Sequence, residues 1–190
     1  MVLTTTNHPP YSIDVDGMGF PRAKVKSKLP ADIASDEKTL TELGHIWYAD
    51  KTMGDFVKQA QSMYSDTLFV ITGDHSERFS FAKEQDTRTL SSIPCIFYGI
   101  GVQQAWFNDK SVGDHMQLAG TLAELLAPEG FTYSAMLPSM FESNFAFNHR
   151  LFAQNGEIKE QKNIDAQLLK EINAMRKVAA WRVQKGNEIE

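Results

Sequence analysis

The sequence predicts an α/β protein with a mainly parallel sheet flanked by helices, followed by a carboxyl-terminal antiparallel hairpin and a final helix. Two short apolar runs, 67–71 and 93–100, are rich in β-branched and aromatic residues, which is typical of strands buried on both faces. A long helical pattern precedes the first run, and a helix that leads into a buried strand is the repeating unit of a parallel sheet. Near the carboxyl end, Asn155-Gly156 is a strong signal for a two-residue hairpin turn.

Three segments have helical spacing of their apolar residues. The first begins near Ser35-Asp36-Glu37, where a capping residue precedes an acid, and ends near 64–66. Its apolar stripe consists of Leu40, Leu43, Ile46, Trp47, Met53, Val57 and Ala60. The second covers about 114–127 and is stopped by Pro128, and the third covers about 164–183.

The amino-terminal part is less regular. Residues 2–6 are rich in β-branched side chains and predict a strand, which Pro9 and Pro10 end. Residues 12–34 contain scattered glycines, prolines and lysines and predict a long surface loop. With no internal repeat and no low-complexity tract, we expect residues 1–190 to form a single domain.

Composition limits the classes of function. The chain has 190 residues, of which 42% are hydrophobic and 23% charged, the balance of a soluble globular protein. A formal charge of -5 argues against a nucleic-acid reader, which would present a basic face. One cysteine excludes an internal disulfide framework and a cysteine-based zinc site. We find no apolar run long enough to span a bilayer and no targeting segment in this chain.

The residues that follow the first predicted strand are the strongest candidates for chemistry. Gly73-Asp74-His75 comes directly after residues 67–71, and ligands of open α/β sheets bind beyond the carboxyl ends of strands. A carboxylate and an imidazole supply oxygen and nitrogen donors that suit zinc or manganese. Gly73 is expected to let the backbone turn sharply, so that both side chains reach one ion.

Several segments together resemble the alkaline phosphatase superfamily, in particular its sulfatase-like branch with the phosphoglycerol transferases and lipoteichoic acid synthases. In that branch a helix with a Tyr-x-Asp-x-x-Met/Leu-x-x-Phe pattern leads to a strand ending in Gly-Asp-His, and a Ser-x-Ile-Pro strand follows. An Asn-His-x-Pro-[FY] segment lines the substrate pocket. In this chain the helix pattern begins at Tyr48, and the strand that ends in Gly-Asp-His begins at Thr67. The Ser-x-Ile-Pro segment begins at Ser92, and the pocket segment begins at Asn7. The resemblance covers roughly residues 1–130.

The resemblance implies roles for individual residues. Asp74 and His75 match the two metal ligands from the carboxyl-terminal half of the family's catalytic domain, and the metal would be zinc or manganese, with magnesium and calcium as alternatives. His8 matches the pocket histidine, which would donate a hydrogen bond to a phosphoryl oxygen or to the leaving group. Apart from the resemblance, Arg78 is a second-tier candidate, because its guanidinium could hold a phosphate through two parallel hydrogen bonds. The alternative is a solvated pair with Glu77 on a loop.

The chain also departs from the family pattern. The branch uses a threonine nucleophile and further acidic ligands that lie before the segment present here, so we expect no catalytic nucleophile in this chain and no activity from it alone. Family members often have Ser-x-x-Asp before a helix carrying Pro-Thr. Here Gln117 stands at the acid and Gly120 at the proline.

Three functions therefore compete. The chain could be the carboxyl-terminal part of a phosphoglycerol transferase-like enzyme, a fragment of a soluble sulfatase or phosphodiesterase, or a non-catalytic module that kept the fold. The first implies a phosphodiester substrate derived from a phospholipid or a glycan. It also implies a periplasmic or cell-surface location, with a membrane anchor in segments outside this chain.

Overall fold

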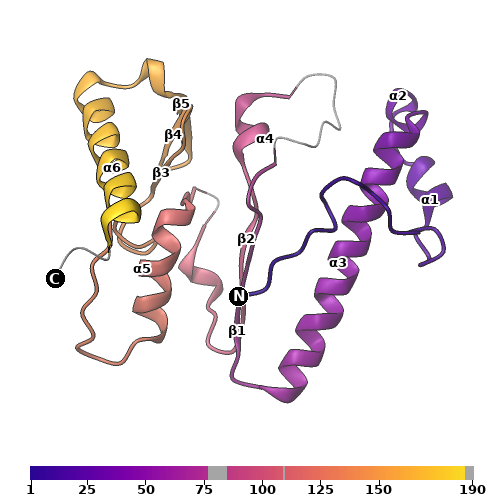
Figure 1. The fold of residues 1–190 in the computed structure, drawn as a ribbon, viewed down its shortest axis with the longest axis horizontal. Coiled ribbons are helices and arrows are strands. Elements are labelled where there is room, and N and C mark those ends of the chain that lie inside the picture. Colours follow the sequence, from indigo (N-terminus) through magenta and orange to yellow (C-terminus); the bar gives the residue numbers. More distant parts are fainter. Residues whose placement is uncertain (77–84, 109, 187–190) are drawn as a thin grey trace. The chain divides into compact units, whose positions relative to one another are not determined.

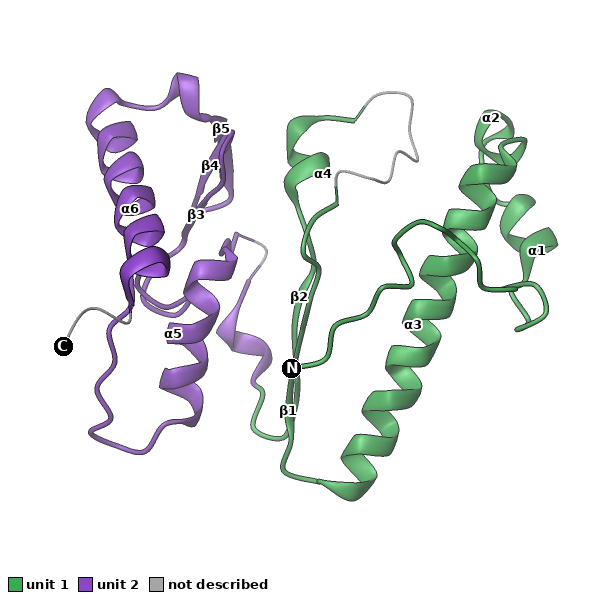
Figure 2. Cartoon of the chain, viewed as in Figure 1, with its two compact units in different colours: residues 1–102 green, residues 103–190 purple. Residues whose placement is uncertain are grey.

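The computed structural model describes residues 1–76, 85–108 and 110–186. The chain divides into two compact units, residues 1–102 and residues 103–190 (Figure 2). In the described residues, no helix combines the length and apolar character that a bilayer crossing requires. The expectation of a single domain over residues 1–190 stays a prediction.

The dominant element of the first unit is α3 (Glu37–Met63), which confirms the first predicted helix (Figure 1). Asp36 caps it, accepting hydrogen bonds from the amide nitrogen of Lys38 at 3.1 Å and the hydroxyl of Thr39 at 2.6 Å. The buried residues lie in its first turns, whereas Phe56 and Met63 in the second half are 50% and 71% exposed. Of the predicted apolar stripe, Met53, Val57 and Ala60 in this second half are only partly buried.

The predicted loop over residues 12–34 contains two short helices, α1 (Arg22–Lys26) and α2 (Ala31–Ala34). Pro21 and Pro30 directly precede them, and proline fits the start of a helix because its fixed φ suits a helical first turn and no amide hydrogen is needed there. The prolines that indicated a loop thus start helices, and the loop prediction was wrong for these residues.

The two predicted strands form a two-stranded antiparallel sheet, β1 (Leu68–Thr72) and β2 (Cys95–Gly99). Leu68 faces Gly99, and Thr72 faces Cys95. The prediction that these strands belong to a mainly parallel sheet is wrong for this pair. A parallel crossover needs a helix long enough to return along the sheet, and the described part of the connection contains the five-residue α4 (Thr87–Ser91).

Burial in this sheet is also lower than predicted. Phe69 is buried at 9% exposure, but Ile96 and Tyr98 on β2 are each 48% exposed, so the strands are not buried on both faces. Residues 2–6 form no strand, and Val2 and Leu3 are 69% and 79% exposed. A strand needs a neighbour for its backbone hydrogen bonds, and no described strand pairs with residues 2–6.

The second unit contains the predicted hairpin within a three-stranded antiparallel sheet. Its order is β3 (Phe145–Phe147), β4 (Leu151–Gln154) and β5 (Glu157–Glu160). Asn155 and Gly156 join β4 to β5 with φ angles of 51° and 81°. Two positive φ angles are what a tight turn of matching twist requires, so the hairpin prediction is confirmed.

Two longer helices accompany this sheet, α5 (His115–Leu126) and α6 (Ala166–Lys185), close to their predicted bounds. Short 3₁₀ turns lie at Gln104–Trp106 and Gln161–Asn163. The core consists of Leu137, Phe147, Phe152 and Ile172, and Met116, Leu168 and Met175 are among the side chains packed against it. Burial of these apolar side chains joins α5, α6 and the sheet into one unit.

Replacing Gly156 with alanine is expected to destabilise the second unit by about 1–2 kcal/mol, because a Cβ atom is unfavourable at positive φ. A Cβ there would also lie 3.3 Å from the Cα and Cβ atoms of Lys110. Urea unfolding, followed by amide signals of β4 and β5, measures the change. The control is Gly186→Ala, where no atom lies within 4 Å of the added carbon; equal losses in the two variants would contradict the explanation.

Candidate functional site

Asp74 and His75 lie directly beyond the paired end of β1. The last pair of the ladder is Thr72 with Cys95, and Gly73 leads from it to the two candidate ligands. The backbone amide of His75 donates to Asp74 Oδ1 at 2.8 Å, which fixes the carboxylate beside the imidazole. Their side chains are 89% and 43% exposed, so an ion and a substrate can reach them.

The distance between the two side chains fits a shared metal ion. Asp74 Oδ2 and His75 Nε2 are 3.5 Å apart. Two donors bound to one tetrahedral ion at about 2.1 Å each would lie about 3.4 Å apart, so little rearrangement would be needed. A carboxylate oxygen and an imidazole nitrogen also match the donor preferences of zinc and manganese. The pair therefore fits two positions of a coordination shell.

Two neighbouring segments support this pair. A Cβ atom at Gly73 would meet Ile93 and Pro94 at 3.6 and 3.9 Å, so the Gly-Asp-His and Ser-x-Ile-Pro segments lie side by side. On the other side of the pair, the hydroxyl of Ser76 donates to the carbonyl oxygen of Leu90 in α4 at 2.7 Å. The pair thus sits on a turn that is fixed at both ends.

The role predicted for Gly73 is not supported. The φ angle of Gly73 does not lie in the positive region that favours glycine. A Cβ atom at this position would be at ordinary van der Waals distance from its neighbours. The turn beyond β1 therefore does not depend on the conformational freedom of glycine.

His8 lies in an exposed turn in which its amide donates to the carbonyl oxygen of Thr5 at 3.0 Å. Its Nδ1 lies 2.7 Å from the carbonyl oxygen of Pro9. A carbonyl can only accept, so Nδ1 carries the hydrogen and Nε2 is the atom available to a ligand. Next to it, the amide oxygen of Asn7 is buried and lacks a hydrogen-bond partner among the described residues.

The structure gives no description of Arg78, which lies in the segment outside the described residues. Within residues 1–76, 85–108 and 110–186, no group of three or more His, Cys, Asp or Glu side chains is placed to hold a metal ion. Asp74 and His75 are therefore a pair and not a complete described site. Among the described residues, the side-chain contact of His8 is with the carbonyl oxygen of Pro9, and the structure shows no contact of His8 with this pair.

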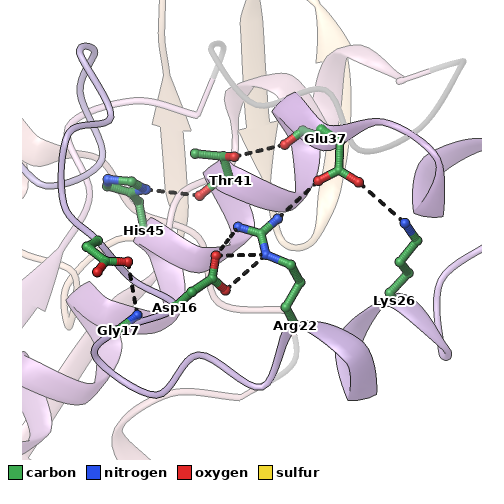
Figure 3. Close-up of polar contacts among 8 residues, drawn as sticks. Asp16, Gly17, Arg22, Lys26, Glu37, Thr41 and His45 are labelled. Atoms are coloured by element: carbon green, nitrogen blue, oxygen red, sulfur yellow. Dashed lines mark hydrogen bonds and ion pairs between the residues drawn. The ribbon is translucent and has the colours of Figure 1, made fainter.

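The segment that follows His8 is fastened to α3 by charged side chains (Figure 3). Arg22 contacts Asp16 through two nitrogens, with Nη2 to Oδ2 at 2.8 Å and Nε to Oδ1 at 2.9 Å. Its Nη1 also lies 3.4 Å from Glu37, and Lys26 approaches the other oxygen of Glu37 at 3.3 Å. These four side chains link α1 with the first turn of α3.

The contact with Arg22 should make the acid titration of Asp16 abnormal. Hydrogen bonding to the guanidinium lowers the pKa of Asp16 below 3.8. Because the folded-state pKa is depressed, this contact stabilises the fold above pH 3.8, and the stabilisation is lost as pH falls through the lower folded value. In an NMR titration of the carboxyl carbons, we expect the midpoint of Asp16 to rise toward 3.8 in Arg22→Gln. Lys26→Gln is the control and should leave that midpoint unchanged.

His45, which was not among the residues predicted from the sequence, is 1% exposed in the first half of α3. Both of its ring nitrogens have partners, Thr41 in the same helix and Ile13 in the loop. Its neighbour Gly44 is also essential to the packing, because a Cβ there would lie 2.6 Å from Val15 Cγ2. A Gly-His dipeptide inside an apolar helical stripe was the available signal, since both residues are unusual choices for a helix interior.

A carboxylate and an imidazole 3.5 Å apart at the end of a strand define a candidate metal-binding site. The model of the family described as Sulfatase matches residues 1–128. The chain therefore belongs to the sulfatase family, in the sulfatase-like branch of the alkaline phosphatase superfamily. Searches of curated proteins and of solved structures gave no match.

Family membership has consequences for fold and chemistry. It implies an α/β fold of the alkaline phosphatase type, to which the helices and antiparallel strands of the chain contribute. It also indicates a sulfatase-like hydrolase or transferase, from a family whose enzymes generally use divalent metals. The matched range includes His8, Asp74 and His75.

Proposed function

We propose that this chain forms part of a metal-dependent phosphoryl-group transferase or hydrolase of the phosphoglycerol transferase type. The observation that carries the proposal is the 3.5 Å separation of Asp74 Oδ2 and His75 Nε2 on a supported turn beyond β1. The remaining ligands and a threonine nucleophile would come from outside residues 1–190. The metal would be zinc or manganese, with magnesium and calcium as alternatives.

Asp74 and His75 would have different tasks. A bound divalent ion supplies Lewis acidity and offsets charge on the phosphoryl oxygens. The Asp74 carboxylate would hold the ion and balance part of its charge, with Oδ1 already engaged by the amide of His75 at 2.8 Å. His75 would bind through one ring nitrogen, with the other fixed by an outer partner.

His8 would contact the substrate through Nε2, because Nδ1 is engaged by Pro9. A neutral imidazole with its hydrogen on Nδ1 presents Nε2 as an acceptor, whereas the protonated ring presents it as a donor. The predicted role, donation to a phosphoryl oxygen or to the leaving group, therefore requires the protonated form.

The substrate class follows from the same resemblance. A phosphodiester derived from a phospholipid or a glycan would be cleaved, and a hydroxyl or water would accept the phosphoryl group. We propose a periplasmic or cell-surface location, with a membrane anchor supplied by segments outside this chain. The formal charge of -5 argues against nucleic acid as a partner.

The test is to join residues 1–190 to the upstream segment of the parent gene and to assay phosphodiester and sulfate-ester cleavage with zinc, manganese, magnesium and calcium. Metal-dependent phosphodiester cleavage is the expected result. Preferential sulfate-ester cleavage would favour the soluble sulfatase alternative. Absence of both activities in a folded protein would favour the non-catalytic module and would overturn the proposal.

A further inference from the structure

The imidazole of His45 makes directed contacts with the segment that carries His8. Its Nε2 lies 3.3 Å from the backbone nitrogen of Ile13, and its Nδ1 lies 3.0 Å from the carbonyl oxygen of Thr41. The ring of Tyr11 meets it edge-on, with centroids 5.1 Å apart and an interplanar angle of 62°. Figure 3 shows the contact with Thr41 inside α3.

These contacts fix the tautomer of His45. The backbone amide of Ile13 can only donate, so Nε2 must be an unprotonated acceptor. The carbonyl oxygen of Thr41 can only accept, so Nδ1 carries the hydrogen. Protonation at Nε2 would place two donors against each other. Both nitrogens are therefore committed to hydrogen bonds, and the ring cannot act as a metal ligand without losing one of them.

On the carboxyl-terminal side of Ile13, the loop is held by packing. Val15 and Phe20 are 3% and 6% exposed, and a Cβ at Gly44 would lie 2.6 and 3.2 Å from their side chains. The ion pairs of Arg22 that follow are more exposed, with 51% of the Asp16 side chain accessible. Exposed ion pairs contribute little, so buried contacts with α3 determine where residues 11–20 lie.

On the amino-terminal side, the contacts of His45 reach the candidate pocket. Only Pro9 and Pro10 separate His8 from Tyr11. Proline fixes φ, so these residues form a stiff connection between the Tyr11 ring and His8. The place of His8 is therefore set largely by Tyr11 and Ile13, and both contact His45.

We infer that His45 is a positioning residue, which fastens Tyr11 and Ile13 to α3 and thereby holds His8 in the substrate pocket. The inference rests on the proposed function for the role of His8, whereas the contacts themselves do not. His45 would touch neither the metal nor the substrate. Its effect on catalysis would pass through the orientation of His8, which a misplacement of about 1 Å is enough to disturb.

The first experiment is NMR spectroscopy of the ¹⁵N-labelled 190-residue chain. The His45 ring should show a protonated Nδ1 and an unprotonated Nε2, a signature that simple apolar packing would not require. The amide of Ile13 should exchange slowly with solvent. The Nε2–H tautomer, or an unprotected Ile13 amide, would overturn the inference.

Variants then separate the hydrogen bond from the packing. His45→Phe keeps a ring but removes the acceptor, so Ile13 exchange should accelerate about tenfold or more and the His8 ring signals should shift. His45→Gln places an amide oxygen near the position of Nε2 and should restore most of the protection. Tyr11→Leu, which leaves His45 intact, should also move the His8 signals, and His149→Gln at an exposed turn serves as the control. Unchanged His8 signals in both His45→Phe and Tyr11→Leu would contradict the inference.

Activity assays distinguish failure of the inference from failure of the proposed function. In the enzyme with its upstream segment, His45→Phe should lower kcat about tenfold while metal affinity stays that of the unmodified enzyme. If the NMR results hold and no variant or parent has activity, the proposed function fails and the positioning contacts stand. If the parent is active and His45→Phe retains full kcat, the positioning role is wrong.

Discussion

Replacing Asp74 with alanine in the enzyme that includes the upstream segment is expected to reduce metal-dependent phosphodiester turnover about a thousandfold. The carboxylate would supply both a ligand and a negative charge to the ion. Lewis-acid stabilisation of a phosphoryl transition state is worth several kcal/mol, and a loss of about 4 kcal/mol corresponds to three factors of ten in rate. The measurement is kcat at saturating metal, together with the metal concentration that gives half of the maximal rate.

The local structure provides a matched control for this variant. Asp66 is also an exposed carboxylate, but it precedes β1 and accepts a hydrogen bond from Ser65 at 3.2 Å. Asp66→Ala should leave kcat and the metal requirement within twofold, about 0.4 kcal/mol. His75→Ala should resemble Asp74→Ala, because the two side chains share one ion in the proposal. Full activity of Asp74→Ala would show that the metal pair is assigned wrongly.

Stability measurements keep this result interpretable. Asp74 is 89% exposed, so its removal should leave the unfolding midpoint of the folded chain nearly unchanged. A large loss of stability would instead indicate that the carboxylate has a structural role through its bond to the His75 amide. A loss of activity with unchanged stability is therefore the combination that supports a role for Asp74 as a metal ligand.

The sequence predicted the elements whose signals are local. The three long helices begin at the aspartates that cap them, Asp36, Asp114 and Asp165, and each accepts backbone hydrogen bonds as a capping residue should. The Asn155-Gly156 turn is also a local signal, because it depends on two residues that tolerate positive φ. Such features can be read without knowing what the segments pack against.

The errors concern properties that depend on distant parts of the chain. Whether β1 and β2 run parallel or antiparallel is decided by the connection between them, and an apolar run has the same composition in either case. The predicted burial of both strands likewise assumed layers of helices that the described first unit does not place over β2. Residues 2–6 have strand composition, but composition cannot supply a pairing partner.

The candidate site shows the same division. The position of Asp74 and His75 directly after a strand was predictable from the sequence, whereas their role as metal ligands stays a prediction. The anchoring role of His45 was not predictable, because its partner Ile13 lies 32 residues away in the sequence. A buried histidine with both nitrogens bonded is visible once the loop and α3 are placed together.

The second large effect is expected at Gln117, which is completely buried in α5. Its amide nitrogen donates to the carbonyl oxygen of Pro138 at 3.2 Å and to the hydroxyl of Ser143 at 2.7 Å. Its amide oxygen accepts from the backbone of Asp114 at 3.0 Å, which completes the capping box of α5. Gln117→Leu would remove all three hydrogen bonds from this buried position and should destabilise the unit by about 3 kcal/mol.

These contacts also show what a glutamine provides at position 117 that a carboxylate would not. A carboxylate can accept the hydrogen bond from Asp114, but it cannot donate to the carbonyl oxygen of Pro138. Gln117→Asp should therefore be destabilising as well, because its shorter side chain replaces a donor with a buried charge. The measurement is urea unfolding followed by amide signals of α5 and β3.

Gln167 in α6 provides the comparison for both variants. It is an exposed glutamine whose amide nitrogen donates to Glu171 at 2.9 Å, so it makes a hydrogen bond of similar type without being buried. Gln167→Leu should change stability by no more than about 0.5 kcal/mol. Equal effects at positions 117 and 167 would show that the buried hydrogen bonds do not determine the loss, since leucine and glutamine have similar helix propensities. A clear difference would show that the buried amide of Gln117 helps to join α5 to the segment before β3, through Pro138 and Ser143. It would act beside the hydrogen bonds that Thr121 and Glu124 of α5 make with Met140 and Ser139.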